Sequence, residues 1–252
     1  MNKKVISVKK QKVLLFTMDS AIGDKLIDRV KQSQYLQLCG VVFSERIFKR
    51  SSNILSGLNI ARLSGYRYMW YLLRITFLRD KRSFKRISRL LQQNNIPVIH
   101  TNDVNTGRMI ERFKQLAPDM ILSCYFNQLI KRPVLDLPYK VLNIHAGLIP
   151  QYRGVEAIMP AILNREPALG VTLHKVNEEL DAGEVLAQDK IPYAPALSLL
   201  DWNITLMTRG IGLLENYLQG AHLEKYSVPE NNYYSWPTRQ DVNSFLKISA
   251  LY

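Results

Sequence analysis

The stretch VLNIHAGLIPQYRG, residues 141–154, decides the predicted fold of this chain. Its apolar start is typical of a buried strand, but Asn143 and His145 stand two residues apart and therefore leave that strand on the same face. An amide and an imidazole are costly in an apolar interior unless both are hydrogen-bonded, whereas open α/β sheets bind ligands at the carboxyl ends of their strands. The stretch therefore predicts a strand that ends in a functional site, below a loop rich in glycine and proline.

Strand-like and helix-like segments alternate on both sides of this stretch. Strands are predicted at residues 12–17, 36–43, 96–100, 119–124, 170–176 and 184–192, and helices at residues 23–30, 104–116, 155–164 and 197–218. This alternation predicts an α/β fold with a Rossmann-like, doubly wound, mostly parallel sheet. We expect a main catalytic domain over residues 1–200 and a short C-terminal helix and tail over residues 201–252.

The composition is that of an ordinary globular protein that does not span a membrane. Of the 252 residues, 47% are hydrophobic and 22% are charged, and no apolar run approaches the roughly 18 residues of a membrane-spanning helix. The basic N-terminus precedes an apolar run that is too short for a signal peptide. Cys39 and Cys124 each lie in an apolar run, so we expect reduced interior thiols, no metal site and a cytoplasmic location.

The net charge of the chain indicates which kinds of partner it favours. The formal net charge of +13 favours anionic partners such as nucleic acid, a nucleotide, phosphate or an anionic membrane surface. Residues 61–92 are both densely aromatic and strongly basic, and they predict two helices with a break near Asp80. We interpret these helices as packed on the sheet with a solvated basic face. A peripheral membrane contact or a basic approach for an anionic substrate are the alternatives.

ELDAG, residues 179–183, supplies a carboxylate that can complete the site. Asn143 offers an uncharged donor to an oxyanion, His145 can exchange a proton near neutral pH, and Asp181 can orient the imidazole. No nucleophile motif such as GxSxG is present, so direct attack of an amine on a carbonyl explains the trio better than an acyl-enzyme does. The alternative is structural, with each residue closing a turn or satisfied in the interior. His174 is interpreted as a structural or partly exposed histidine, not as a catalyst.

The residues NIHAGLIPQYRG, followed by GVTLHKVNEELDAGEVLAQDKIP, resemble the paired signature of the folate-dependent formyltransferases. APDMILSCYFNQLI, residues 117–130, is similar to the strand and loop that precede this signature. The resemblance covers about half of the chain and implies the formyltransferase fold, with 10-formyltetrahydrofolate as cosubstrate and a primary amine as acceptor. By motif position it also implies that Asn143, His145 and Asp181 are the catalytic residues.

The resemblance further implies where the two substrates bind. The folate is expected to lie between two segments and to contact them largely through backbone groups, at Phe126, Gln128, Leu129, Ile130, Glu179, Leu180 and Asp181. Tyr152, Arg153 and Gly154 are expected beside the acceptor.

Departures from the family pattern narrow the expected acceptor. MDSAIG, residues 18–23, does not reproduce the glycine- and serine-rich phosphate loop of the glycinamide ribonucleotide enzymes, and too few residues follow Leu218 for the C-terminal barrel of the methionyl-tRNA enzymes. The SWPT tail, residues 235–238, is similar to those of formyltransferases that lack that barrel. We therefore expect an amino-sugar N-formyltransferase that acts on a nucleotide-linked sugar for a surface polysaccharide, such as the O-antigen of lipopolysaccharide.

Several alternatives stay open. A methionyl-tRNA formyltransferase-like enzyme without the barrel, a catalytically silent binding protein with the same fold, and a hydrolase that releases formate from the folate are all compatible with the motifs. Tyr233, Tyr234 and Trp236 either stack on a base or sugar or, as we prefer, anchor the tail to the core. We expect a small-molecule amine as partner, tRNA as the less favoured one and no DNA. A homodimer formed through the C-terminal segment is also compatible with the sequence.

Overall fold

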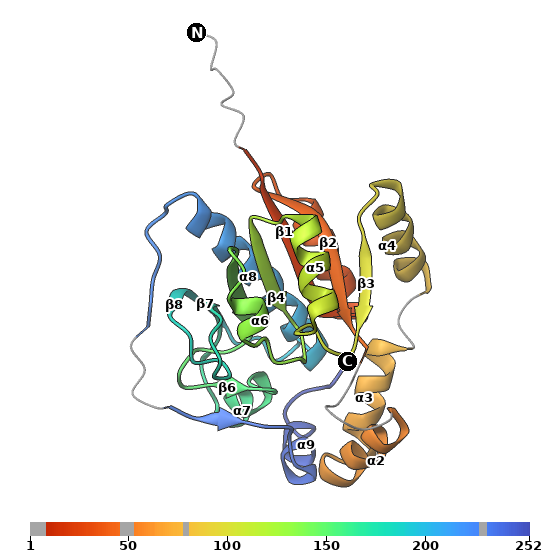
Figure 1. Ribbon diagram of the computed structural model, residues 1–252. Helices are drawn as coiled ribbons and strands as arrows, with labels where there is room; N and C mark the ends of the chain where they lie inside the picture. The colour runs from red at the N-terminus through yellow and green to blue at the C-terminus, as the bar shows by residue number, and fades with distance from the viewer. Residues whose placement is uncertain (1–8, 46–52, 78–80, 227–230) are drawn as a thin grey trace.

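The computed structural model describes residues 9–45, 53–77, 81–226 and 231–252, and a seven-stranded sheet lies at the centre of these residues (Figure 1). The strands follow the order β3-β2-β1-β4-β5-β7-β8. Their bounds are β1 Gln11–Met18, β2 Leu36–Ser44, β3 Val98–Thr101, β4 Met120–Cys124, β5 Lys140–His145, β7 Ala168–Lys175 and β8 Val185–Pro192. The first five strands in this order pair in parallel, and β7 and β8 add antiparallel pairs. The predicted Rossmann-like, mostly parallel sheet is confirmed.

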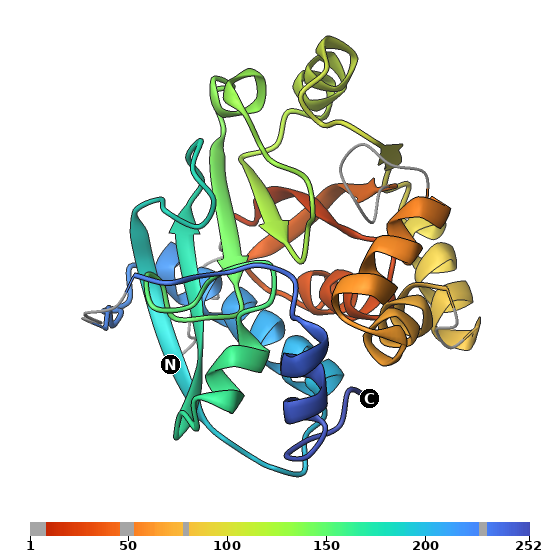
Figure 2. The same ribbon diagram turned by 90° about the horizontal axis from the view of Figure 1, so that it is seen from below.

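Helices cover both faces of the sheet (Figure 2). Alternate residues of β1 point to opposite sides: Val13 belongs to a core beneath several helices, and Leu14 belongs to a second core beneath the other face. The first face is covered by α1 Ala21–Lys31, α7 Ile158–Leu163, α8 Leu199–Leu218 and α9 Arg239–Phe245, and the second by α5 Gly107–Leu116 and α6 Arg132–Leu135. Burial on both faces explains the nearly continuous apolar runs of the strands.

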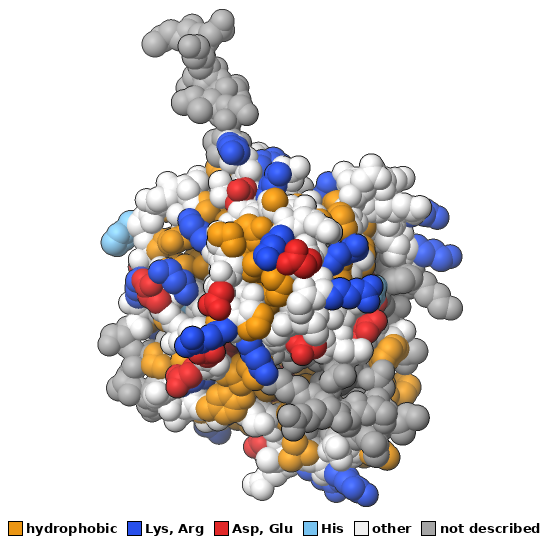
Figure 3. All heavy atoms as spheres, in the orientation of Figure 1, with side chains coloured by type: hydrophobic (Ala, Val, Ile, Leu, Met, Phe, Trp, Pro, Cys, Tyr) orange, Lys and Arg blue, Asp and Glu red, His pale blue; other side chains and the backbone are white. Residues whose placement is uncertain are grey.

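Two helices lie within the aromatic and basic segment at residues 61–92, as predicted: α3 Tyr66–Thr76 and α4 Lys81–Gln93. An additional helix that was not predicted, α2 Asn53–Leu63, precedes them and ends before Gly65, whose φ of 84° is one that glycine adopts readily. The predicted break at Asp80 lies outside the described residues. Tyr71 and Ile87 are buried in the core, as the packing interpretation expected. Figure 3 shows Lys and Arg side chains at the edge of the molecule formed by α4.

The C-terminal residues return to the sheet and to the loop above β5. The division predicted at residue 200 falls inside α8, which packs against β5, β7 and β8. Further on, β9 Tyr233–Tyr234 pairs in parallel with β6 Arg153–Gly154. The tail therefore lies beside the loop that the sequence places over the candidate site. Within the described ranges, each helix is too short or too polar to cross a membrane.

Candidate active site

Asn143 and His145 lie at the carboxyl end of β5, on the same face of the strand, as their spacing predicts. β7 pairs with β5 in the antiparallel sense, and this register sets His174 directly opposite Asn143 and Thr172 opposite His145. His145 is buried and Asn143 is half-buried. The end of the strand therefore presents an amide and two imidazoles within a small volume.

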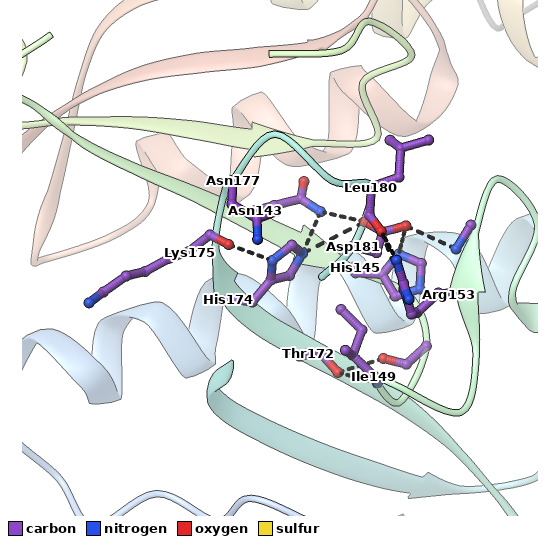
Figure 4. Close-up of polar contacts among 12 residues, drawn as sticks. Asn143, His145, Ile149, Arg153, Thr172, His174, Lys175, Asn177, Leu180 and Asp181 are labelled. Atoms are coloured by element: carbon purple, nitrogen blue, oxygen red, sulfur yellow. Dashed lines mark hydrogen bonds and ion pairs between the residues drawn. The ribbon is translucent and has the colours of Figure 1, made fainter. Parts of the chain in front are cut away.

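Asp181 reaches this group from the turn between β7 and β8 (Figure 4). Its Oδ2 accepts a hydrogen bond of 2.9 Å from the backbone N–H of Gly154 and lies 3.7 Å from Nδ1 of His145. Its Oδ1 lies 3.5 Å from Nδ2 of Asn143 and 3.7 Å from Nε2 of His174. The carboxylate therefore lies between all three polar side chains.

The turn that carries Asp181 depends on two unusual backbone positions. Asp181 itself has a φ of 49°, in the left-handed region that aspartate tolerates better than most residues. Gly183 passes so close to β7 that an added Cβ would lie 1.7 Å from the carbonyl oxygen of Lys175. Since only glycine allows this approach, the sequence Asp-Ala-Gly is what brings the carboxylate over the end of β5.

His145 faces an oxygen acceptor on each side of its ring. Nε2 lies 2.6 Å from the carbonyl oxygen of Tyr152, and Nδ1 faces the carboxylate of Asp181. A carbonyl oxygen can only accept, so Nε2 carries a hydrogen. Nδ1 points toward the carboxylate of Asp181, so these two contacts fix the orientation of the imidazole at the end of β5.

His174 is buried, with a side chain that is 3% exposed. Of the two options that the sequence left open, a structural or a partly exposed histidine, the structure supports the structural one. Nδ1 lies 2.8 Å from the carbonyl oxygen of Lys175 and therefore donates, which leaves Nε2 as an acceptor for the amide of Asn143 at 3.0 Å. Burial lowers the pKa of His174 to about 4, with the nearby Asp181 carboxylate opposing this shift. His174 is thus held as a neutral ring that orients Asn143.

A cavity of about 390 Å³ opens beside these residues. Its lining comes from the end of β5, the loop after β4, helix α3, the turn before β8 and the C-terminal tail. The residues include Asn143, His145, Asp181, Phe126, Gln128, Leu129, Tyr68, Leu72, Thr76, Glu156, Leu180, Tyr233 and Trp236. The polar trio therefore lies at the wall of a space large enough for a small organic ligand.

Glu156 and Tyr68 belong to this cavity, although the motifs gave them no role. Glu156 is buried, accepts a 2.9 Å hydrogen bond from the hydroxyl of Tyr68 and faces the backbone N–H of Met159 at 3.3 Å. Burial raises the pKa of Glu156, and these hydrogen bonds oppose the shift. The one signal in the sequence is the acid itself, which stands alone in the apolar run at residues 155–163.

The residues predicted to bind the folate fall into two groups. Phe126, Gln128, Leu129, Leu180 and Asp181 line the cavity. Ile130 and Glu179 do not line it: Ile130 is buried in the core of the opposite face, and Glu179 is exposed. The side-chain amide of Gln128 is also used within the protein, because Nε2 donates to Ser44 and to the carbonyl of Thr101.

The residues predicted beside the acceptor are also divided. Gly154 lines the cavity and binds Asp181, as described above. The guanidinium of Arg153 donates to the carbonyl of Leu180 at 2.6 Å and thereby fastens the Asp181 turn. Tyr152 is buried behind the loop, where its hydroxyl donates to Glu166 at 2.7 Å. The structure thus gives Arg153 and Tyr152 supporting contacts.

The aromatic tail is anchored to the core, which is the interpretation preferred from the sequence. Tyr234 stacks on Tyr152 with ring centroids 5.5 Å apart, and Trp236 meets Tyr68 edge to face at 6.4 Å. These contacts anchor the tail to the core. Tyr233 and Trp236 also line the cavity. No cluster of three or more His, Cys, Asp or Glu side chains suited to a metal ion occurs among the described residues.

Comparisons with known proteins agree with this geometry. The sequence model of the family described as "Formyl transferase" matches residues 77–206, slightly more than half of the chain. A methionyl-tRNA formyltransferase from Clostridium acetobutylicum is 33% identical over 160 residues, which is 61% of this chain and 52% of that protein. The chain therefore spans about half the length of this curated relative.

Solved structures of related enzymes share the fold. A phosphoribosylglycinamide formyltransferase from Bacillus halodurans has a TM-score of 0.56 at 16% identity, over 83% of this chain and 94% of that chain. A sugar N-formyltransferase from Shewanella sp. FDAARGOS_354 has a TM-score of 0.54 at 16% identity, over 89% of this chain and 76% of that chain. Since the family match covers the β5 strand and the Asp181 turn as well as half of the chain, this protein belongs to the formyl transferase family.

Proposed function

We propose that this protein transfers a formyl group from 10-formyltetrahydrofolate to the primary amine of an amino sugar that is carried on a nucleotide. The observation that carries the proposal is the convergence of Asn143, His145 and Asp181 at the wall of one cavity. An amide donor, an imidazole and a carboxylate in contact are groups that suit the attack of an amine on a formyl carbon.

The proposed reaction forms one carbon–nitrogen bond and breaks another. The free amine attacks the formyl carbon, and the formyl oxygen becomes an oxyanion that accepts hydrogen bonds from Nδ2 of Asn143 and Nδ1 of His145. Collapse of this intermediate breaks the bond between the formyl carbon and N10 of the folate. The proton that the amine loses passes through Asp181, directly or by way of water, to N10, so charge and protons balance.

Contacts around Asp181 support its part in this proton transfer. One of its oxygens, Oδ2, is hydrogen-bonded to the backbone N–H of Gly154, and both oxygens face ionisable or amide groups. Oδ1 can therefore receive a proton while the hydrogen bond between Oδ2 and Gly154 keeps the turn in place. Arg153 keeps the turn in place from outside the cavity.

The cavity wall contributed by the C-terminal tail supports an amino sugar as acceptor. Tyr233 is half-exposed and lies at the cavity together with Trp236, and aromatic rings of this kind stack on sugar faces and on bases. A cavity of about 390 Å³ has the size of sites for small molecules.

Formyl transfer to a panel of amines tests the proposal. We expect turnover of 10-formyltetrahydrofolate with nucleotide-linked amino sugars, and a Tyr233→Ala variant should raise the KM for the sugar about tenfold, with little change in the KM for the folate. The matched control is Ile248→Ala, another exposed apolar residue of the C-terminal part that does not line the cavity. Failure to formylate any amino sugar would refute the assignment of the acceptor.

Methionyl-tRNA is the second candidate acceptor, because the curated relative with 33% identity is a methionyl-tRNA formyltransferase and the net charge is +13. Under this alternative, methionyl-tRNA is formylated and the amino sugars are not. The rate of formylation should also fall steeply as the salt concentration rises. Release of formate without any amine would indicate a hydrolase, and absence of both reactions would indicate a binding protein.

A further inference from the structure

The solvent face of α3 carries an unusual row of aromatic residues. Tyr66, Trp70 and Phe77, the residue that caps the helix, recur at spacings of four and seven and therefore share one face of the helix. Their exposed fractions are 67%, 48% and 60%. Large side chains that are exposed singly need no explanation, but a row of three on one helix face does.

The side chains of these aromatic residues do not pack in the hydrophobic core. The opposite face of α3 supplies Tyr68, Tyr71 and Ile75, which are buried, and Tyr68 also lines the cavity. The helix is therefore already anchored to the protein, with the cavity on one side and the aromatic row on the other. The row is available to something outside the chain.

Positive charge accompanies the row. Arg67 and Arg74 flank it on the same helix, and both are exposed. The guanidinium of Arg74 lies 4.1 Å from the ring centroid of Tyr252, which is itself 48% exposed and so extends the aromatic surface. We call Tyr66, Arg67, Trp70, Arg74, Phe77 and Tyr252 the α3 patch.

The surrounding segment is strongly basic. Residues 53–93 contain nine of the 34 Lys and Arg residues but only one of the 21 acidic residues, Asp80. On α4, four exposed basic residues share one helix face: Arg82, Lys85, Arg86 and Arg89. This segment therefore contributes most of the net charge of +13 and would attract an anionic surface over a distance of about 10 Å.

We propose that the α3 patch docks on the surface of an anionic lipid bilayer. Exposed Trp, Tyr and Phe next to Arg is the combination that favours the interface between lipid headgroups and acyl chains. Each basic residue near an anionic bilayer adds attraction, and the aromatic rings add apolar burial. Because α3 separates the patch from the cavity, docking would hold the cavity close to the membrane surface.

Two other partners fit the patch less well. RNA would use the Arg residues, but Leu58 and Leu63 of the neighbouring α2 are also exposed, and leucine gains nothing from phosphates or from base stacking. A second copy of the chain would bury the apolar residues. In a two-fold symmetric dimer, however, Arg67 and Arg74 of one copy would face basic residues of the same segment in the other copy. This like-charge contact is unfavourable, because the segment contains almost no acidic residue to balance it.

Sedimentation with lipid vesicles tests the proposal without any use of enzymatic activity. We expect the protein to bind vesicles that contain phosphatidylglycerol, to bind pure phosphatidylcholine much more weakly, and to be released by salt. Trp202 is buried and Trp236 is half-buried, so a blue shift of tryptophan emission on binding should disappear in a Trp70→Phe variant.

Two double variants separate the apolar and the electrostatic contributions. Trp70→Ser with Phe77→Ser, and Arg67→Gln with Arg74→Gln, should each weaken binding about tenfold or more. The matched controls are Val98→Ser with Ile248→Ser, which are exposed apolar residues elsewhere, and Lys12→Gln with Lys140→Gln, exposed basic residues at the amino ends of β1 and β5. Circular dichroism verifies folding, and the Arg variant keeps the test valid if the apolar variant does not fold.

Three results would overturn the proposal. The first is equal binding to both kinds of vesicle or to neither. The second is equal loss of binding in the α3 variants and the control variants. The third is tight, α3-dependent binding of RNA, or an α3-dependent dimer in light scattering, without vesicle binding.

Discussion

Nδ2 of Asn143 lies 3.0 Å from Nε2 of His174, although the two residues are 31 positions apart in the chain. The antiparallel register of β5 and β7 sets them opposite each other, and the hydrogen bond from His174 to the carbonyl of Lys175 leaves Nε2 without a hydrogen. An acceptor at this point holds the N–H₂ end of the amide, and not its oxygen, at the site. His174 is therefore a positioning residue for the proposed oxyanion donor.

Replacement of His174 should lower the rate through Asn143. We expect His174→Ala to reduce kcat about tenfold to a hundredfold with little change in the KM for the folate, because a misplaced donor affects the transition state more than binding. His174→Gln, which retains an acceptor oxygen, should recover part of the loss. An equal loss in both variants, or a change in KM alone, would argue against positioning.

The stability of the protein should also depend on His174 in acid. Its pKa is lowered from 6.5 in the unfolded chain to about 4 in the folded state, so between these values the unfolded state binds a proton that the folded state does not. The free energy of unfolding should therefore fall as the pH drops from about 6.5 to about 4. In His174→Gln this part of the pH dependence should be absent, as urea titrations across the range can verify.

Glu156 should change the pH dependence of the unfolding free energy in the direction opposite to His174. Its pKa is raised in the folded state by burial, so its contribution to stability is present at acid pH and is lost as the pH rises through the folded pKa. Glu156→Gln keeps the size and the acceptor for Met159 but removes the titration. The variant should gain stability relative to the parent protein as the pH rises. A difference in unfolding free energy that stays constant between acid and alkaline pH would contradict this prediction.

Asp181→Asn should lower the catalytic rate without lowering the stability of the fold. The amide oxygen of Asn can still accept the hydrogen bond from Gly154, so we expect a melting temperature close to that of the parent protein. The variant cannot take up the proton of the attacking amine and does not balance a protonated His145. We therefore expect kcat to fall about a hundredfold or more. A variant with the parent rate would remove Asp181 from the mechanism.

Gly147→Ala should displace the imidazole of His145. An added Cβ would lie 2.5 Å from the carbonyl oxygen of Tyr152 and 2.7 Å from Nε2 of His145, which are the two atoms of one hydrogen bond. We expect a loss of about 1–3 kcal/mol in unfolding free energy, together with a lower kcat. Gly57→Ala is the matched control. Its Cβ would meet no atom within 4 Å, and alanine is the better helix former, so stability should hold or rise slightly.

The centre of the site could be predicted because its geometry is local. The spacing of Asn143 and His145 sets them on one face of any strand, and the order of apolar and polar runs predicted the strands and the sheet. Ser20 illustrates the same point, because its side chain caps α1 through a contact with Gly23, only three residues away. The Asp-Ala-Gly turn also shows its tightness in the sequence, through Gly183.

The rest of the site depends on contacts between distant segments. The sequence shows that α3 has a buried face, but not that this face meets Glu156 and the cavity, since hydrophobic periodicity does not specify the partner of a helix. Likewise, His174 became part of the site through the register of two antiparallel strands. The sequence by itself determined which residues share a face of one strand and where its tight turns occur, because φ/ψ preferences and side-chain periodicity act over a few residues. Only the tertiary structure decided which of these faces meet, because that choice depends on the packing of the whole core.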